Sequence, residues 1–326
     1  MKTTLRGTLL RLAVSLASIA AVAYVLRDKL DEALHILRHD VSWPCFSVVC
    51  VVYLAGLIVI SMRMKYVFRV QQLYIGFRES FYLGCIGLFF NLFFPSAIGG
   101  DVAKAYFVYK HTGKKIESLT SVILDRLMGF VAMSLMAVVA LFLFSKELGD
   151  PRIDRLIYVF MGFMLLVVCF LGSRHVARAF GFLRFLLPSE RAKAKCRDIY
   201  YAFYGYKYHM HILVFSIVLS LLAQSLFVVA HYGLAYSLGL RLNLWIFFIV
   251  VPIIAIVSMA PSLGGLGVRE AGAIYLFSRF MSPEQALAMS ILIDLILYGF
   301  SFLSGILFSL KGGLRAKTIH EMEELE

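Results

Sequence analysis

Long apolar runs separated by short polar segments dominate the chain. Such runs cover residues 12–26, 43–62, 117–144, 156–171, 212–238 and 284–310. A helix needs roughly 17–25 predominantly apolar residues to cross about 30 Å of hydrocarbon. The pattern therefore predicts six transmembrane helices, with a short amphipathic helix between residues 27 and 42. The aromatic segment YYAFYGYKY at residues 200–208 predicts an interfacial belt at the entrance to the fifth span.

Two further apolar runs, residues 81–98 and 244–259, end at glycine pairs. Several lysines follow the first pair, and a full crossing at residues 81–98 would place them outside, against the tendency of cytoplasmic loops to be basic. The charge pattern favours a re-entrant hairpin on the cytoplasmic side and a second hairpin that enters from the outside. We therefore expect an all-α polytopic membrane protein with inverted internal repeats, about six full spans and two re-entrant broken hairpins. Eight full spans is the alternative.

One motif occurs at both breaks. Residues 95–104 have the sequence PSAIGGDVAK and residues 261–269 have the sequence PSLGGLGVR. Each contains Pro-Ser, a short apolar link, Gly-Gly, three residues and a cation. Paired interruptions in apolar sequence are typical of the binding centre of a transporter built from repeats. We expect a single integral-membrane domain over residues 1–326, with repeat halves at roughly 43–172 and 209–310.

Composition is typical of a membrane protein and argues against nucleic acid, metal ions and cofactors as partners. Of the 326 residues, 61% are hydrophobic and 16% are charged, against about 25% charged in soluble domains. Most of the 32 basic residues fall in segments predicted to be cytoplasmic, including Arg63, Lys65 and Arg69 after the second span. The distribution of these basic residues indicates cytoplasmic termini. In a membrane protein the net charge of +12 is therefore not evidence for nucleic-acid binding. The five cysteines have no disulfide or metal-site spacing, so we expect no metal and no cofactor.

The doubled motif predicts an anion site. A helix that begins just after a glycine turn presents free N–H groups and the positive end of its dipole. Lys104 and Arg269 would add a full positive charge about one turn into each helix. The predicted substrate-binding residues are Asn91, Pro95, Gly99, Gly100, Asp101, Lys104, Pro261, Gly264, Gly265, Gly267 and Arg269. The alternative is that the glycines serve helix packing and the cations extend to the interface.

Charged residues inside or beside the spans form a second candidate group. An ionised side chain at the centre of a span costs about 2.5–3.5 kcal/mol on insertion scales, and such residues usually face an interior path or pair with one another. The residues predicted to gate transport or couple protons are Asp125, Arg126, Glu270 and Asp294. A structural ion pair is the alternative for these residues.

Three segments resemble a known family: NLFFPSAIGGD at residues 91–101, DRL at 125–127 and PSLGGLGVRE at 261–270. They are similar to the integral-membrane, flippase-like domain of the lysylphosphatidylglycerol synthetases and their stand-alone relatives. The resemblance implies a flippase for an anionic or aminoacylated phospholipid, or for a polyprenyl-phosphate-linked lipid. Lys104 stands where arginine is commoner in the family and Asp125 where glutamate is usual, which leaves head-group preference open. The chain ends soon after its last span, so we do not expect lysyl transfer.

The expected function is therefore lipid transport in the cytoplasmic (inner) membrane, within cell-envelope metabolism. No catalytic motif occurs in the sequence, and we do not expect an enzyme. The alternative function is a non-transporting membrane subunit or scaffold of an enzyme for lipid or cell-envelope glycan biosynthesis. The partners expected besides the lipid are a glycosyltransferase or lipid-synthesis enzyme and a second copy of the chain.

Overall fold

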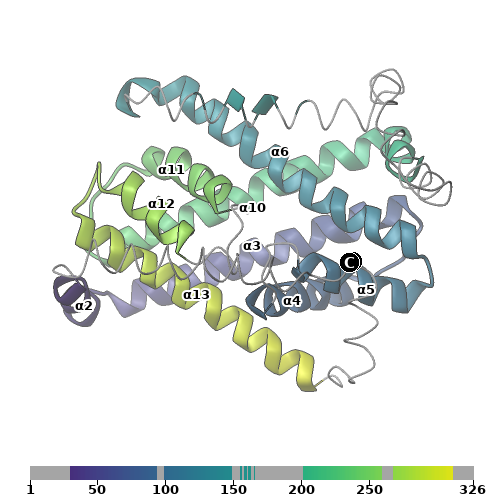
Figure 1. Cartoon of the computed structure of the whole chain (residues 1–326), viewed down its shortest axis with the longest axis horizontal. Coiled ribbons are helices and arrows are strands. Elements are labelled where there is room, and N and C mark those ends of the chain that lie inside the picture. Colours follow the sequence, from purple (N-terminus) through teal and green to yellow (C-terminus); the bar gives the residue numbers. More distant parts are fainter. Residues whose placement is uncertain are drawn as a thin grey trace, which may run out of the picture. The chain divides into compact units, whose positions relative to one another are not determined.

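The structure, a computed structural model, describes residues 30–93, 99–148, 201–258 and 267–310, with isolated positions between residues 155 and 165. Every regular element within those residues is a helix (Figure 1). In chain order they are α2 (Leu30–His39), α3 (Trp43–Val70), α4 (Phe77–Phe93), α5 (Gly99–Thr112), α6 (Lys115–Leu148), the 3-10 turn η3 (Tyr206–His209), α10 (Met210–Ser237), α11 (Leu244–Val257), α12 (Val268–Phe277) and α13 (Pro283–Leu310). Helix α2 confirms the short helix predicted before the second span.

Four helical segments are long and apolar enough to cross a membrane. They are Trp43–Val70, Lys115–Ala140, Tyr201–Ser237 and Pro283–Leu310. Each corresponds to one predicted span, so the chain is an all-α, multi-pass membrane protein. The predicted spans at residues 12–26 and 156–171 fall outside the continuous described ranges and stay predictions.

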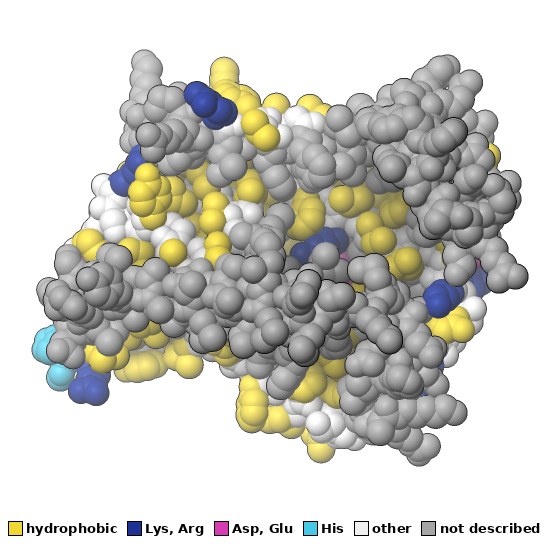
Figure 2. All heavy atoms as spheres, viewed as in Figure 1, with side chains coloured by type: hydrophobic (Ala, Val, Ile, Leu, Met, Phe, Trp, Pro, Cys, Tyr) yellow, Lys and Arg dark blue, Asp and Glu magenta, His cyan; other side chains and the backbone are white. Residues whose placement is uncertain are grey.

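The long helices present apolar side chains outward. Val51 of α3 is 66% exposed, Phe142 of α6 is 86% exposed and Phe302 of α13 is 67% exposed. Hydrophobic side chains cover much of the described surface on the face drawn in Figure 2, with few charged groups between them. In water such surface would be costly, whereas hydrocarbon is the solvent that suits it.

Short helices flank both glycine breaks. Helices α4 and α5 have 17 and 14 residues, and α11 and α12 have 14 and 10. At 1.5 Å per residue, α11 is roughly 21 Å long, which is less than the hydrocarbon thickness. In the first pair the backbones touch, because a Cβ on Gly100 of α5 would lie 2.2 Å from the carbonyl oxygen of Gly87 in α4. These lengths and this close approach favour the two predicted hairpins over the alternative of eight full spans.

The chain divides into two compact units. Unit 1 comprises residues 1–58, 81–104 and 223–326, and unit 2 comprises residues 59–80 and 105–222. Both copies of the Pro-Ser-Gly-Gly motif belong to unit 1. In unit 1, α12 packs between α11 and α13, and α2 contacts α13.

The second span is longer than its apolar pattern predicts. Helix α3 continues to Val70, so the assignment of Arg63 to a cytoplasmic loop was wrong. Arg63 is only 4% exposed. The physical reason is that Met64, Val67 and Phe68 continue a fully buried face at helical spacing beyond Arg63. The polar residues of this last stretch lie between those core positions rather than in a loop.

Candidate functional site

Helix α12 begins directly after the second glycine break. Its N-cap, Gly267, has φ 81° and ψ −47°, a backbone conformation that L side chains rarely adopt. The Glu270 carboxylate accepts a hydrogen bond from the Gly267 N–H and so satisfies one of the free donors at the helix start. Glycine and glutamate at these two positions therefore fix where α12 starts. The neighbouring motif residues Pro261, Gly264 and Gly265 lie outside the described residues.

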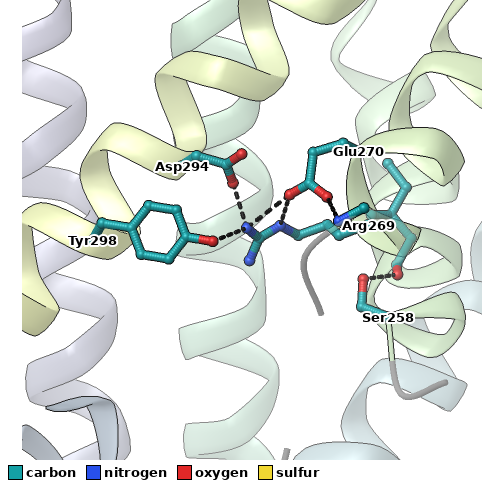
Figure 3. Close-up of polar contacts among 7 residues, drawn as sticks. Ser258, Arg269, Glu270, Asp294 and Tyr298 are labelled. Atoms are coloured by element: carbon teal, nitrogen blue, oxygen red, sulfur yellow. Dashed lines mark hydrogen bonds and ion pairs between the residues drawn. The ribbon is translucent and has the colours of Figure 1, made fainter. Parts of the chain in front are cut away.

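The Arg269 side chain leaves this helix start and extends toward α13 (Figure 3). Its Nη2 donates to Glu270 Oε1 at 3.0 Å, to Asp294 Oδ1 and to the Tyr298 hydroxyl at 3.4 Å. Its Nε also donates to Glu270 Oε1, at 3.2 Å. We call these four residues, Arg269, Glu270, Asp294 and Tyr298, the Arg269 cluster. They join the broken hairpin to the following full span.

The Arg269 cluster is largely shielded from solvent and carries a net negative charge. The side chains of Arg269, Glu270 and Asp294 are 17%, 13% and 15% exposed. One guanidinium faces two carboxylates, so the three ionised groups sum to one negative charge. Tyr53 of α3 and His231 of α10 lie close enough to the guanidinium to feel its charge. Side chains of four helices of unit 1 therefore surround this cation.

The first break has a similar helix start with a different pairing. Asn91 Oδ1 accepts a hydrogen bond from the Gly100 N–H at 2.8 Å, so this side chain satisfies a donor at the start of α5. Lys104 Nζ lies 3.1 Å from Asp101 Oδ1, and both side chains are mostly buried. Gly99 and Gly100 are buried. Pro95 lies outside the described residues.

A second buried polar group occupies unit 2. Arg63 of α3 makes a two-point ion pair with Asp125 of α6, with Nε–Oδ1 at 2.8 Å and Nη2–Oδ2 at 2.9 Å. Its Nη1 donates to Ser220 Oγ of α10 at 2.8 Å. The two charged side chains are 5% and 7% exposed. Arg126, next in sequence to Asp125, instead places its guanidinium over the Phe130 ring, 5.3 Å from the centroid.

The predicted site residues thus fall into two groups. The described motif residues of both breaks, with Glu270 and Asp294, belong to unit 1, whereas Asp125 and Arg126 belong to unit 2. Sequence reasoning missed Arg63, Tyr298 and the other residues around the two cations. The available signal for Arg63 was that apolar residues continue at helical spacing after it, at Met64, Val67 and Phe68. Tyr298 could have been found from its position one turn after Asp294 on the same helix face.

The described residues contain no group of three or more His, Cys, Asp or Glu side chains that could hold a metal ion. Both breaks present a helix start, a cation and a carboxylate. Such groups can bind a charged head group, exchange partners or carry a proton.

Comparison with known proteins identifies a family for the chain. Residues 8–305 match the family described as the lysylphosphatidylglycerol synthase TM region. A search of curated proteins finds no match to the chain. The family indicates a role connected with membrane lipids. Because the match covers nearly the whole sequence, the chain belongs to the lysylphosphatidylglycerol synthase transmembrane-region family.

Proposed function

We propose that the protein is a flippase that moves a lipid with a charged head group between the two leaflets. Candidate lipids are an anionic or aminoacylated phospholipid and a polyprenyl-phosphate-linked lipid. The observation that carries the proposal is that both glycine breaks, each with a cation and a carboxylate just after its helix start, belong to one compact unit of a multi-pass protein. Membership of a lipid-related family adds independent support.

The proposed mechanism is alternating exposure of a site near the middle of the membrane. The helix starts at Gly100 and Gly267, with Lys104 and Arg269, hold the head group, while the acyl or prenyl chains stay in the bilayer. Glu270 and Asp294 compete with the head group for Arg269 and so gate its binding. In unit 2, Asp125, Arg126 and Arg63 take part in gating the movement of the lipid. The proposal places the protein in the cytoplasmic membrane with both termini cytoplasmic.

A leaflet-exchange assay tests the proposal. Purified protein is reconstituted into liposomes that contain labelled phosphatidylglycerol, labelled lysyl-phosphatidylglycerol or labelled polyprenyl phosphate, and an external reagent reports how much label is accessible. The key variant is Lys104→Glu/Arg269→Glu, which reverses both motif cations. Its matched control is Arg38→Glu/Lys115→Glu, which reverses two exposed cations outside the proposed site.

We expect wild type and the control to move at least one of these lipids, and the motif variant to lose at least tenfold in rate. Loss in both double variants would trace the effect to general charge rather than to the motif. No movement of any lipid by folded protein, with and without an imposed pH gradient, would contradict the flippase and favour the scaffold or enzyme-subunit alternative. A partner enzyme would then be sought by co-purification.

A further inference from the structure

We propose that the Arg269 cluster is a proton-binding site, and that its proton decides whether Arg269 can bind a phosphodiester head group with two hydrogen bonds. This inference rests on the proposed function and adds the ion that would drive it. The ligand class is a proton together with a singly charged phosphodiester.

The net charge of the Arg269 cluster favours the binding of a proton. Arg269 contacts two carboxylates, Glu270 and Asp294, and all three side chains are at least four-fifths shielded. An anionic head group arriving at Arg269 would add to a site that already carries one net negative charge. Charges within a membrane protein are tolerated where they are balanced. One proton shared by the two carboxylates balances the empty cluster, and two interacting acids of this kind take up protons as a pair.

The hydrogen bonds that Arg269 already makes limit what it can offer to a phosphate. Nη2 of Arg269 has two hydrogens but three acceptors around it, from Glu270, Asp294 and Tyr298. Nε is also bonded to Glu270. Among the described residues no hydrogen-bond partner contacts Nη1, and Figure 3 draws this nitrogen without a contact. In this state the guanidinium can offer a phosphate oxygen only the Nη1 group.

A proton on Asp294 changes that count. A protonated carboxyl group has lost its negative charge, so it is a weaker acceptor for the guanidinium, and it becomes a donor itself. Nη2 then keeps its bond to Glu270, and its second hydrogen has only the long 3.4 Å contact to Tyr298. A phosphate oxygen can displace that weak contact, so this hydrogen and Nη1 together form the planar fork that binds phosphate oxygens at two points. Proton uptake thereby converts Arg269 from a one-point to a two-point phosphodiester ligand.

The groups that face the cluster from neighbouring helices leave the carboxylates as the proton acceptors. Tyr53 of α3 and Tyr298 of α13 contribute neutral phenols. His231 of α10 is the other titratable group near Arg269 in the described residues, and its Nδ1 lies 2.8 Å from the Phe227 carbonyl oxygen. One turn before Asp294 on α13, the Ser290 hydroxyl is buried and has no partner within the described chain. It offers Asp294 a polar neighbour on the same helix face.

The coupling is reciprocal by necessity. If a proton strengthens head-group binding, the head group strengthens proton binding by the same factor. Proton and lipid therefore cross together, and a pH gradient favours movement away from the acidic side. A site in which Arg269 bound lipid independently of its carboxylates would show neither effect.

Binding is measured with the full-length protein in detergent and dihexanoyl phosphatidylglycerol as the probe, from pH 5 to pH 8. The phosphodiester of this lipid stays ionised over the whole range, so changes in affinity report on the protein. Proton uptake on binding is followed in weakly buffered solution with a pH indicator. For wild type we expect affinity to rise by up to about tenfold per pH unit on acidification, with uptake of up to one proton per bound lipid.

Three variants locate the proton. Asp294→Asn should bind with the affinity of acidified wild type at every pH and should take up no proton. His231→Gln and Asp40→Asn, the latter an exposed carboxylate outside unit 1's helix breaks, should keep the wild-type slope. Loss of the slope in His231→Gln would overturn the assignment to the carboxylates.

The two levels of the proposal fail differently. Wild-type binding and leaflet exchange that do not change with pH, and that Arg269→Gln abolishes, would overturn the proton site and leave the flippase standing. Absence of binding and exchange at every pH would overturn both. If Asp294→Asn does not fold, the wild-type proton count decides the question: no proton uptake on binding overturns the proposal.

Discussion

Removing one partner of the Arg63–Asp125 pair should destabilise the protein far more than removing both. The pair makes two short hydrogen bonds at 2.8 and 2.9 Å, and its side chains are 5% and 7% exposed. Breaking a buried pair strands one charge without compensation, which costs about 3–5 kcal/mol. We therefore expect Arg63→Met and Asp125→Leu each to raise the equilibrium constant for unfolding by about two to nearly four powers of ten.

The double variant Arg63→Met/Asp125→Leu has no stranded charge and no unpaired amide. Ser220, which loses the Arg63 donor, still donates its own hydroxyl to the Ser216 carbonyl at 2.8 Å, so its hydrogen remains satisfied. Replacement of a whole buried ion pair by hydrophobic residues of similar volume is often close to neutral. We expect the double variant to lie within about 1 kcal/mol of wild type.

The assay is unfolding in mixed micelles, with increasing dodecyl sulfate and helical circular dichroism as the signal. Leaflet exchange is measured in parallel on each variant. Single variants as stable as wild type would contradict the burial of the pair. A double variant no more stable than the weaker single variant would show that stranded charge is not the cause. A stable double variant that has lost transport would instead give this pair a role in gating.

Three further predictions concern packing and topology. Gly100→Ala should lower the free energy of unfolding by about 1–3 kcal/mol in the same assay, because its Cβ would lie 2.2 Å from a backbone oxygen of α4. Its control, Gly299→Ala, has open space around the new Cβ and should be neutral or stabilising. A cysteine at His111, an exposed position in the last turn of α5, should react with a membrane-impermeant reagent only from the cytoplasmic side; labelling only from outside would contradict the re-entrant hairpin. Tyr206→Phe should cost about 1 kcal/mol, since the hydroxyl contacts Ser121 Oγ at 2.9 Å, and no change would show that this contact is not formed.

Hydropathy and the positions of the glycine pairs were enough to predict the all-α membrane architecture. Apolar runs of membrane length predict full spans wherever they occur, because lipid leaves helices as the only way to satisfy each backbone group. The same signal separates the short helices α4, α5, α11 and α12, since glycine pairs interrupt their apolar runs. Gly267 needs its glycine for a backbone conformation, and Gly100 needs one for close approach. Both needs are local, so sequence pattern could reveal them.

Partner choice could not be predicted in the same way. The Tyr200–Tyr208 belt was predicted to be interfacial, yet Tyr206 is 2% exposed and bonds to Ser121, so the prediction was wrong for this residue. Arg63 was assigned by charge to a loop, although it pairs with an acid 62 residues away. Hydropathy averages over a window and counts a cation as polar wherever it lies. Only the helix packing in unit 2 determines that this cation faces an acid and a hydroxyl.

Asp125 and Asp294 show how much partner choice matters. Helices follow the same order of long, short, break, short and long in α3–α6 and in α10–α13, and each final long helix carries an acid away from its ends, Asp125 or Asp294. Asp125 pairs with Arg63 from the first long helix of its half, whereas Asp294 pairs with Arg269 from the broken hairpin. A pair that joins two long helices can be replaced by neutral groups without loss of its purpose, if that purpose is packing. A pair that holds the cation at a helix start cannot, because the neutral replacement has no positive charge to offer a phosphate. Neutralising both members should therefore restore stability at Asp125 and should fail to restore lipid movement at Asp294.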